Sequence, residues 1–212
     1  MDNNTYRARV LETESRPAAL NFGPATLLIA LNMAVAASNV VDHIKRAIYY
    51  GKDADQQAAT NDLMVLMSTA AAVKFAFETG RYRDPRDIDF YRDKLEPSVA
   101  QHLSAEGVDL RLLHAALGKF TESGEFVQAL IPTLMGASVD RVNLAEEIGD
   151  SGWYEEIAMD ALGLTREQVN DANIKKLQDK KAGRYKKGEF LADDAVNRDT
   201  QAERAVLEGT VA

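Results

Sequence analysis

Two pairs of carboxylates stand in the second half of the chain, and the second pair starts 22 positions after the end of the first. Glu122 and Glu125 form the first pair, and Glu147 and Asp150 form the second. Each pair is spaced i, i+3, which on a helix places both side chains on one face about one turn apart. Four converging acids repel one another unless cations lie between them, and hard oxygen ligands of this kind suit Mg²⁺ or Mn²⁺. The residues therefore predict a divalent-metal site, with Glu146 beside the second pair.

The two acidic segments read ESGE and EEIGD, and they lie within a longer set of framing residues. Leu112-Leu113-His114-Ala115 and Gly118 precede the first pair, Trp153-Tyr154 follows the second, and the run Asn173-Ile174-Lys175-Lys176-Leu177 comes later. This pattern resembles the MazG-like, all-α nucleotide pyrophosphohydrolase family. The likeness covers the second half of the chain closely and the first half in a decayed form.

The resemblance implies a reaction, NTP + H₂O → NMP + pyrophosphate, that depends on Mg²⁺, with Mn²⁺ as the alternative ion. It implies that the metal ligands are Glu122, Glu125, Glu147 and Asp150. Divalent ions neutralise the phosphates and lower the pKa of a bound water. One of these acids, or Glu146, would orient or deprotonate the attacking water, and the sequence leaves open which one.

Several residues after the second acidic pair are expected to bind the substrate. Asn173 and Lys176 are one turn apart on one face and are candidates for phosphate contacts. Arg184 and Tyr185 are candidates for closing over the nucleotide, or else belong to a solvated tail.

Three further substrate contacts are expected around the acids. Tyr154 lies four positions after Asp150, on the metal face, where it would support a ligand or the sugar. His114 lies about three turns before Glu125 and would touch the base or sugar, with a capping or packed histidine as the competing interpretation. Lys45 would reach the phosphates from the first half of the chain, or else ends an exposed basic helix.

Periodicity and stop signals predict an all-α fold. Glycines at 51, 80 and 163 are predicted helix ends, and Thr165-Arg166-Glu167-Gln168 is a capping-box signature. A stripe of apolar residues with 3–4 spacing, from Leu113 to Ile131, is expected to form the packed face of the first acidic helix, with both acids off that stripe. The expected helices cover 6–14, 25–50, 56–77, 90–103, 110–130, 143–162, 165–180 and 194–207.

The two halves of the chain align without gaps at a constant offset of 85 residues, although few residues are identical. Ser38 then falls on Ser123, and the positions 51 and 55 fall on Gly136 and Asp140. We therefore expect a degenerate MazG-like half over 1–84, a catalytic half over 85–190 and a C-terminal tail over 191–212. An N-terminal helical extension with chance matches is the competing interpretation.

The acids differ between the two halves. Three of the four metal acids align with Ala37, Val40 and Val65, and only Glu147 has an acidic counterpart, Asp62. Because the family's helices pair as dimers, the resemblance implies a pseudo-dimer within one chain. Its two halves would share a four-helix-bundle core, and a further homodimer of the fused chain is compatible with it.

Composition limits the classes of function. The chain has 212 residues, no cysteine and a net charge of −8, which excludes thiolate chemistry and gives no support to nucleic-acid binding. Residues 22–41 carry no charge and are long enough to span a bilayer. Pro24 and several polar residues favour instead a helix buried on all sides, so we expect a cytoplasmic protein without a membrane partner.

Two alternatives compete with the pyrophosphohydrolase. A di-iron carboxylate bundle requires Glu-x-x-His twice, and none of His43, His102 and His114 follows a Glu at that spacing. The second is a nucleotide-binding or protein-interaction module on the same helical scaffold that does not turn its ligand over.

Overall fold

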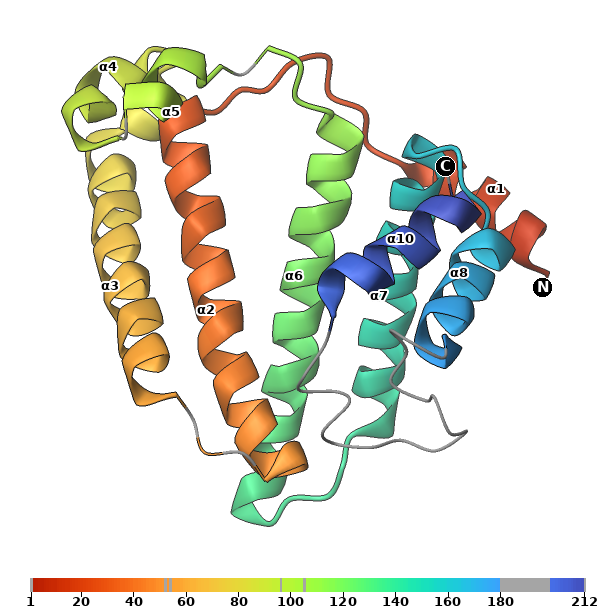
Figure 1. The fold of residues 1–212 in the computed structure, drawn as a ribbon. Helices are drawn as coiled ribbons and strands as arrows, with labels where there is room; N and C mark the ends of the chain where they lie inside the picture. Colours follow the sequence, from red (N-terminus) through yellow and green to blue (C-terminus); the bar gives the residue numbers. More distant parts are fainter. Residues whose placement is uncertain are drawn as a thin grey trace. The chain divides into compact units, whose positions relative to one another are not determined.

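A computed structural model describes residues 2–51, 53, 55–95, 97–104, 106–179 and 199–211 of the chain. Within these residues it contains nine α-helices, three short 3-10 helices and no strand (Figure 1). The predicted all-α fold class is therefore confirmed. The chain divides into two compact units, Met1–Arg16 with Asp109–Ala212, and Pro17–Val108.

The first unit is built on a pair of long helices, α6 (Leu110–Leu130) and α7 (Arg141–Ala161), which run antiparallel side by side (Figure 1). A 3-10 helix, η3 (Ile131–Met135), joins them. The short helix α1 (Asn3–Thr13) packs against α7. After α7 come α8 (Arg166–Gln178) and α10 (Thr200–Val211), which contact each other.

The second unit is also built on a pair of long helices, α2 (Pro24–Tyr50) and α3 (Gln56–Thr79). Short elements follow: η1 (Arg81–Arg83), α4 (Asp87–Tyr91), η2 (Arg92–Lys94) and α5 (Pro97–His102). Asp87 is 1% exposed and caps the start of α2, because its carboxylate accepts hydrogen bonds from the backbone N–H groups of Ala25 and Thr26 at 3.0 and 2.7 Å.

The long helices follow the sequence signals closely. α6 has the predicted bounds, and Thr165 and Gln168 form the predicted capping box at the start of α8. The expected helix over 90–103 is instead broken into α4, η2 and α5, with Pro97 as the first residue of α5. The last helix begins at Thr200, later than expected.

The unit boundaries differ from the expected division after residue 84. The chain leaves the second unit at Val108, and α1, from the N-terminus, belongs to the unit that carries the acids. The relationship between the two units as copies of one ancestral half stays a prediction.

The two helix pairs nevertheless use the same kind of connection. Gly51 ends α2 and Gly136 ends η3, with left-handed φ angles of 61° and 85°, a conformation that glycine adopts without a steric penalty. Asp55 and Asp140 then cap the next helices, each accepting a hydrogen bond from a backbone N–H of the first turn. These four residues are the ones that the 85-residue offset superposes in sequence.

Within the first unit, α7 does not cover the predicted apolar stripe of α6. Leu117, Phe120, Val127 and Ile131 are 41–55% exposed, whereas the buried residues of α6 are the small Ala115 and Gly118. Periodicity identified an apolar face correctly, but α7 packs on the neighbouring face, where small residues allow the two helices to approach closely.

Within its own unit, helix α2 is covered only in part. Its most apolar window has a mean hydropathy of 1.6, but only 22% of that window is buried, and Val41, Ile44 and Ile48 are 55–68% exposed. By length and composition α2 is the one candidate membrane span within the described residues.

At Gly118, α6 lies directly against Tyr154 of α7. A Cβ atom at this position would lie 2.1 Å from Cε1 of Tyr154, so the tyrosine ring packs directly on the glycine backbone. This contact fixes the spacing of the two helices one turn away from Glu122 and Asp150.

An arginine clamp ties α1 and its following residues to α6 and α7. Arg111 donates two hydrogen bonds to Glu14, at 2.6 and 2.8 Å, and one to Asp160 at 2.7 Å. Asp160 also accepts a hydrogen bond from Arg7 at 2.6 Å. These partners lower the pKa of Glu14, chiefly through Arg111, and that of Asp160, chiefly through Arg7.

We predict that Gly118→Ala destabilises the protein by about 1–3 kcal/mol, because the new methyl group must displace Tyr154. Gly124→Ala, on the same helix with nothing within 4 Å of the added atom, should instead stabilise it by about 0.5–1 kcal/mol. Urea unfolding of both variants checks this. Equal effects of the two substitutions would show that the Gly118–Tyr154 contact does not set the helix spacing.

We also predict that the clamp makes the first unit acid-labile. Because the pKa values of Glu14 and Asp160 are lowered on folding, the unfolded state binds more protons. The stabilisation is present above the ordinary carboxyl range and is lost as the pH falls through the lowered values. Arg111→Met should lower the free energy of unfolding by about 3 kcal/mol at pH 7 and make stability less dependent on acid pH. Arg9→Met is the control, because the exposed pair of Arg9 with Glu12 contributes little, and it should change neither quantity. Urea midpoints between pH 7 and pH 3 provide the measurement.

Candidate metal centre

Three of the four predicted metal acids meet between α6 and α7. Glu122 from α6 and Glu147 and Asp150 from α7 each offer a carboxylate oxygen, and these oxygens all lie within 4.8 Å of one another. Three carboxylates at this separation form a donor set of the kind that hard divalent cations prefer. We call this group the carboxylate cluster.

Glu147 is the buried member of the carboxylate cluster. It is 6% exposed, and its Oε2 atom has no hydrogen-bond partner among the described residues. Burial raises the pKa of Glu147 above its ordinary value, and the negative charge of Glu125 raises it further. A hydrogen bond between the carboxyl groups of Glu147 and Glu122, and the charges of Glu122 and Glu146, act in the same direction. A buried carboxylate oxygen without a proton donor, next to other acids, is the environment that a bound cation would relieve.

Glu125 and Glu146 lie just outside the carboxylate cluster. Both are exposed, and neither belongs to the group whose oxygens lie within 4.8 Å. Their charges still act on the site, because both raise the pKa of Glu147. The structure thus brings three of the expected ligands together and places the fourth, with the neighbouring Glu146, at the edge.

The aligned position in the second unit has a different environment. Asp62, the counterpart of Glu147, accepts a hydrogen bond from Asn39 at 3.1 Å, and its other oxygen lies 3.1 Å from Nε2 of His43. Both oxygens of Asp62 therefore have polar neighbours on α2, so this position does not require a cation in the way that Glu147 does.

Tyr154 and His114 belong to an aromatic cluster against the same helices. The ring of His114 meets Trp153 and Tyr154 edge to face, at centroid distances of 5.8 and 5.3 Å. Trp153 donates a hydrogen bond to Thr13 of α1 at 3.1 Å. Burial raises the pKa of Tyr154, and the charges of Glu122, Asp150 and Glu125 raise it further, so its hydroxyl lies within the field of the acids.

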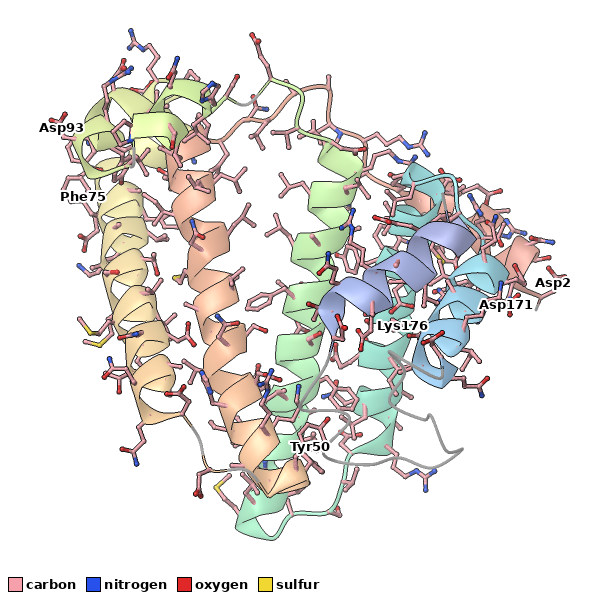
Figure 2. All side chains as sticks on the ribbon, viewed as in Figure 1. Asp2, Tyr50, Phe75, Asp93, Asp171 and Lys176 are labelled. Carbon is pink, nitrogen blue, oxygen red and sulfur yellow. The ribbon has the colours of Figure 1, made fainter. Side chains whose placement is uncertain are left out.

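Two neighbouring hollows flank α7 within this unit. A groove of about 420 Å³ runs past the carboxylate cluster, where Glu122, Ser123, Glu147 and Ser151 contribute to its lining. A cavity of about 560 Å³ lies between α7, α8 and α10 and includes Asn173 and Lys176 in its lining (Figure 2 labels Lys176). Glu155 lines both hollows.

Glu155 also joins two cations that the sequence did not single out. It accepts hydrogen bonds from Lys119 at 2.7 Å and from Arg166 at 2.6 Å, and Arg166 bonds Glu156 as well. These bonds lower the pKa of Glu155 against the effect of its burial. Lys119 lies one turn before Glu122, a spacing that could have identified it, whereas nothing in the sequence shows that Arg166 reaches across from α8.

The three remaining substrate candidates are Lys45, Arg184 and Tyr185. Lys45 belongs to the second unit, where it pairs with Asp42, as does Arg46. Arg184 and Tyr185 lie outside the described residues.

The chain matches no protein-family model, no curated protein and no solved structure. The likeness to the MazG-like family thus rests on the two acidic motifs and their framing residues.

We predict that Glu147→Gln removes a pH-dependent weakness of the metal-free protein. Because folding raises the pKa of Glu147, the folded state binds more protons, so stability falls as the pH rises from the ordinary carboxyl range through the raised value. The amide variant should not show this fall, and it should gain less thermal stability than the wild type on addition of Mn²⁺.

Melting temperatures measured from pH 4.5 to pH 8, with EDTA or with MnCl₂, test this prediction. Asp171→Asn, which alters an exposed acid of α8, is the matched control (Figure 2 labels Asp171). An identical Mn²⁺ response of Glu147→Gln and the wild type would exclude Glu147 as a ligand.

Proposed function

We propose that the protein is a Mg²⁺-dependent nucleoside triphosphate pyrophosphohydrolase that converts (d)NTP to (d)NMP and pyrophosphate. The observation that carries the proposal is the environment of Glu147. Its buried Oε2 has no hydrogen-bond partner among the described residues, and its carboxylate offers an oxygen within 4.8 Å of oxygens from Glu122 and Asp150. The MazG-like arrangement of the acidic motifs, on two antiparallel helices, supports it. A four-helix core, control of the nucleotide pool and a cytoplasmic location are parts of the same proposal.

The carboxylate cluster would hold the metal. Glu122, Glu147 and Asp150 would supply oxygen ligands, which fit Mg²⁺ or Mn²⁺. Glu125, whose charge acts on Glu147, is the candidate for a fourth ligand. When bound, the ion neutralises phosphate charge, lowers the pKa of a coordinated water and stabilises the leaving pyrophosphate.

The proposed reaction is an attack of water on a phosphorus atom of the triphosphate. The oxygen of a water molecule forms a new bond to phosphorus at the linkage between the α- and β-phosphates, and the bridging P–O bond breaks. The electron pair of that bond leaves with pyrophosphate. The proton of the water passes to a carboxylate at the edge of the cluster, for which Glu125 and Glu146 are the exposed candidates.

Cations on the other side of Glu155 would stabilise the remaining phosphate charge. Lys119 lies one turn from Glu122 on α6, and Lys176 is half-buried in the neighbouring cavity. Among the described residues, no ion pair involves Lys176.

One observation favours the alternative, a module that binds nucleotides without turnover. Lys119 and Arg166 are both already paired with Glu155, so part of the positive charge near the acids is neutralised inside the protein. In a hydrolase these pairs must loosen or share their donors when a triphosphate enters.

We predict Mg²⁺-dependent release of pyrophosphate from at least one member of a panel of dNTPs and NTPs. Glu147→Gln and Asp150→Asn should lower kcat/KM about 100-fold or more, because loss even of an outer partner of a metal ligand costs about 10- to 100-fold. Asp171→Asn should retain full activity. Comparison of Glu125→Gln with Glu146→Gln, through the pH profile of kcat, identifies the acid that takes the proton.

Wild-type protein that binds nucleotides but releases no pyrophosphate from any of them, with either Mg²⁺ or Mn²⁺, would contradict the enzyme and favour the binding module. Release that survives EDTA and the Glu147→Gln change would contradict the metal centre.

A further inference from the structure

The cavity between α7, α8 and α10 has the make-up of a ligand site. Its volume of about 560 Å³ lies within the range typical of small-molecule sites. Apolar side chains form much of its wall, including Met159 of α7, Leu162 just after it, Val169 of α8 and Leu207 of α10. A few polar groups stand among them, as in sites that orient a mostly apolar ligand.

The cavity adjoins the groove of the carboxylate cluster. Glu155 lines both, and Lys119, which also lines the cavity, lies one turn from Glu122 on α6. Along α7 the distance from Asp150 to Ala158 in the cavity wall is about 12 Å, at 1.5 Å per residue. This separation is comparable with the reach from the phosphates of a nucleotide to its base.

The chemistry of the lining changes along this path. Carboxylates lie at one end, the cations Lys119 and Arg166 stand beside Glu155, and the apolar wall lies beyond them. A charged phosphate group is not stabilised by contact with apolar side chains. A heterocyclic base, with apolar faces and a hydrogen-bonding edge, matches both that wall and the side-chain amide of Asn170, which lines the cavity with Asn173.

We propose that this cavity binds the nucleoside portion of the substrate, while its phosphates extend past Lys119 and Glu155 to the carboxylate cluster. The proposal rests on the proposed function. It assigns the choice of base to α8 and α10, with Asn170 reading the base edge and the apolar wall packing on its faces. The aromatic cluster of His114, Trp153 and Tyr154 is then a packing element and makes no contact with the base.

Filling the cavity tests the proposal. Val169→Trp places an indole in it, and Ile174→Trp adds the same bulk to α8 at a half-exposed position that does not line it. The probes are a set of deoxynucleoside triphosphates whose α–β bridging oxygen is replaced by a methylene group, and inorganic tripolyphosphate, each with Mg²⁺. For the analogue that binds best, Val169→Trp should raise Kd at least tenfold. The Kd of Val169→Trp for tripolyphosphate should stay within twofold of the wild-type value. Ile174→Trp should bind both the analogue and tripolyphosphate with Kd values within twofold of the wild type.

A second measurement uses the unaltered protein, in case Val169→Trp does not fold. In protein with ¹³C-labelled methionine methyl groups, the analogue should shift the signal of Met159, which is 5% exposed in the cavity wall. The signal of Met135, 77% exposed at the far end of η3, should stay unchanged. Tripolyphosphate should leave Met159 nearly unaffected.

The outcomes separate the two proposals. An analogue that binds the wild type without shifting Met159, or that binds Val169→Trp as tightly as the wild type, overturns the nucleoside site and leaves the hydrolase intact. Wild-type protein that binds no analogue and no tripolyphosphate overturns the proposed function, and the nucleoside site with it. Binding of tripolyphosphate alone overturns the nucleoside site only.

Discussion

The central constraint on the first unit is the free-energy cost of keeping the buried carboxylate of Glu147 ionised. Glu147 is largely removed from water, other acids lie next to it, and one of its oxygens has no hydrogen-bond donor in the described part of the chain. A carboxylate in such a place is unfavourable unless it is protonated or meets a cation. Nothing about the helix pair itself requires an acid at this position. The counterpart in the second unit, Asp62, instead has a polar neighbour at each of its carboxylate oxygens, Asn39 at one and His43 at the other. The contrast between these two environments is the physical reason for assigning chemistry to one helix pair and not to the other.

The rest of the unit holds the acids close to one another. Gly118 allows α6 to approach α7 until the ring of Tyr154 lies on its backbone. The arginine clamp ties α1 to this pair through Glu14 and Asp160. Both features hold α6 and α7, the helices that carry the carboxylates, so packing and ion pairs elsewhere on these helices oppose the repulsion between the acids.

The sequence predicted the helices well, because their ends are encoded locally. Aspartates at 55, 109 and 140 and the capping box at Thr165 mark helix starts, and left-handed glycines mark helix ends. The i, i+3 spacing of the acids also predicted that Glu147 and Asp150 share a face. The packing could not be predicted in the same way, because a stripe of apolar residues shows that a face is apolar without showing what covers it. For α6, α7 packs instead on the face of Ala115 and Gly118. The bridge from Arg166 to Glu155 and Glu156 depends on where α8 crosses α7, which no local signal encodes.

The most direct test of the central claim is a titration of the wild-type protein with Mn²⁺, followed by electron paramagnetic resonance of the free ion, at pH 5.5 and at pH 7.5. A buried acid that must lose its proton to bind a metal predicts saturable binding of at least one Mn²⁺ per chain, tighter at the higher pH and competed by Mg²⁺. Weak binding that does not saturate, or an affinity that is the same for the Glu147→Gln variant, would contradict the account.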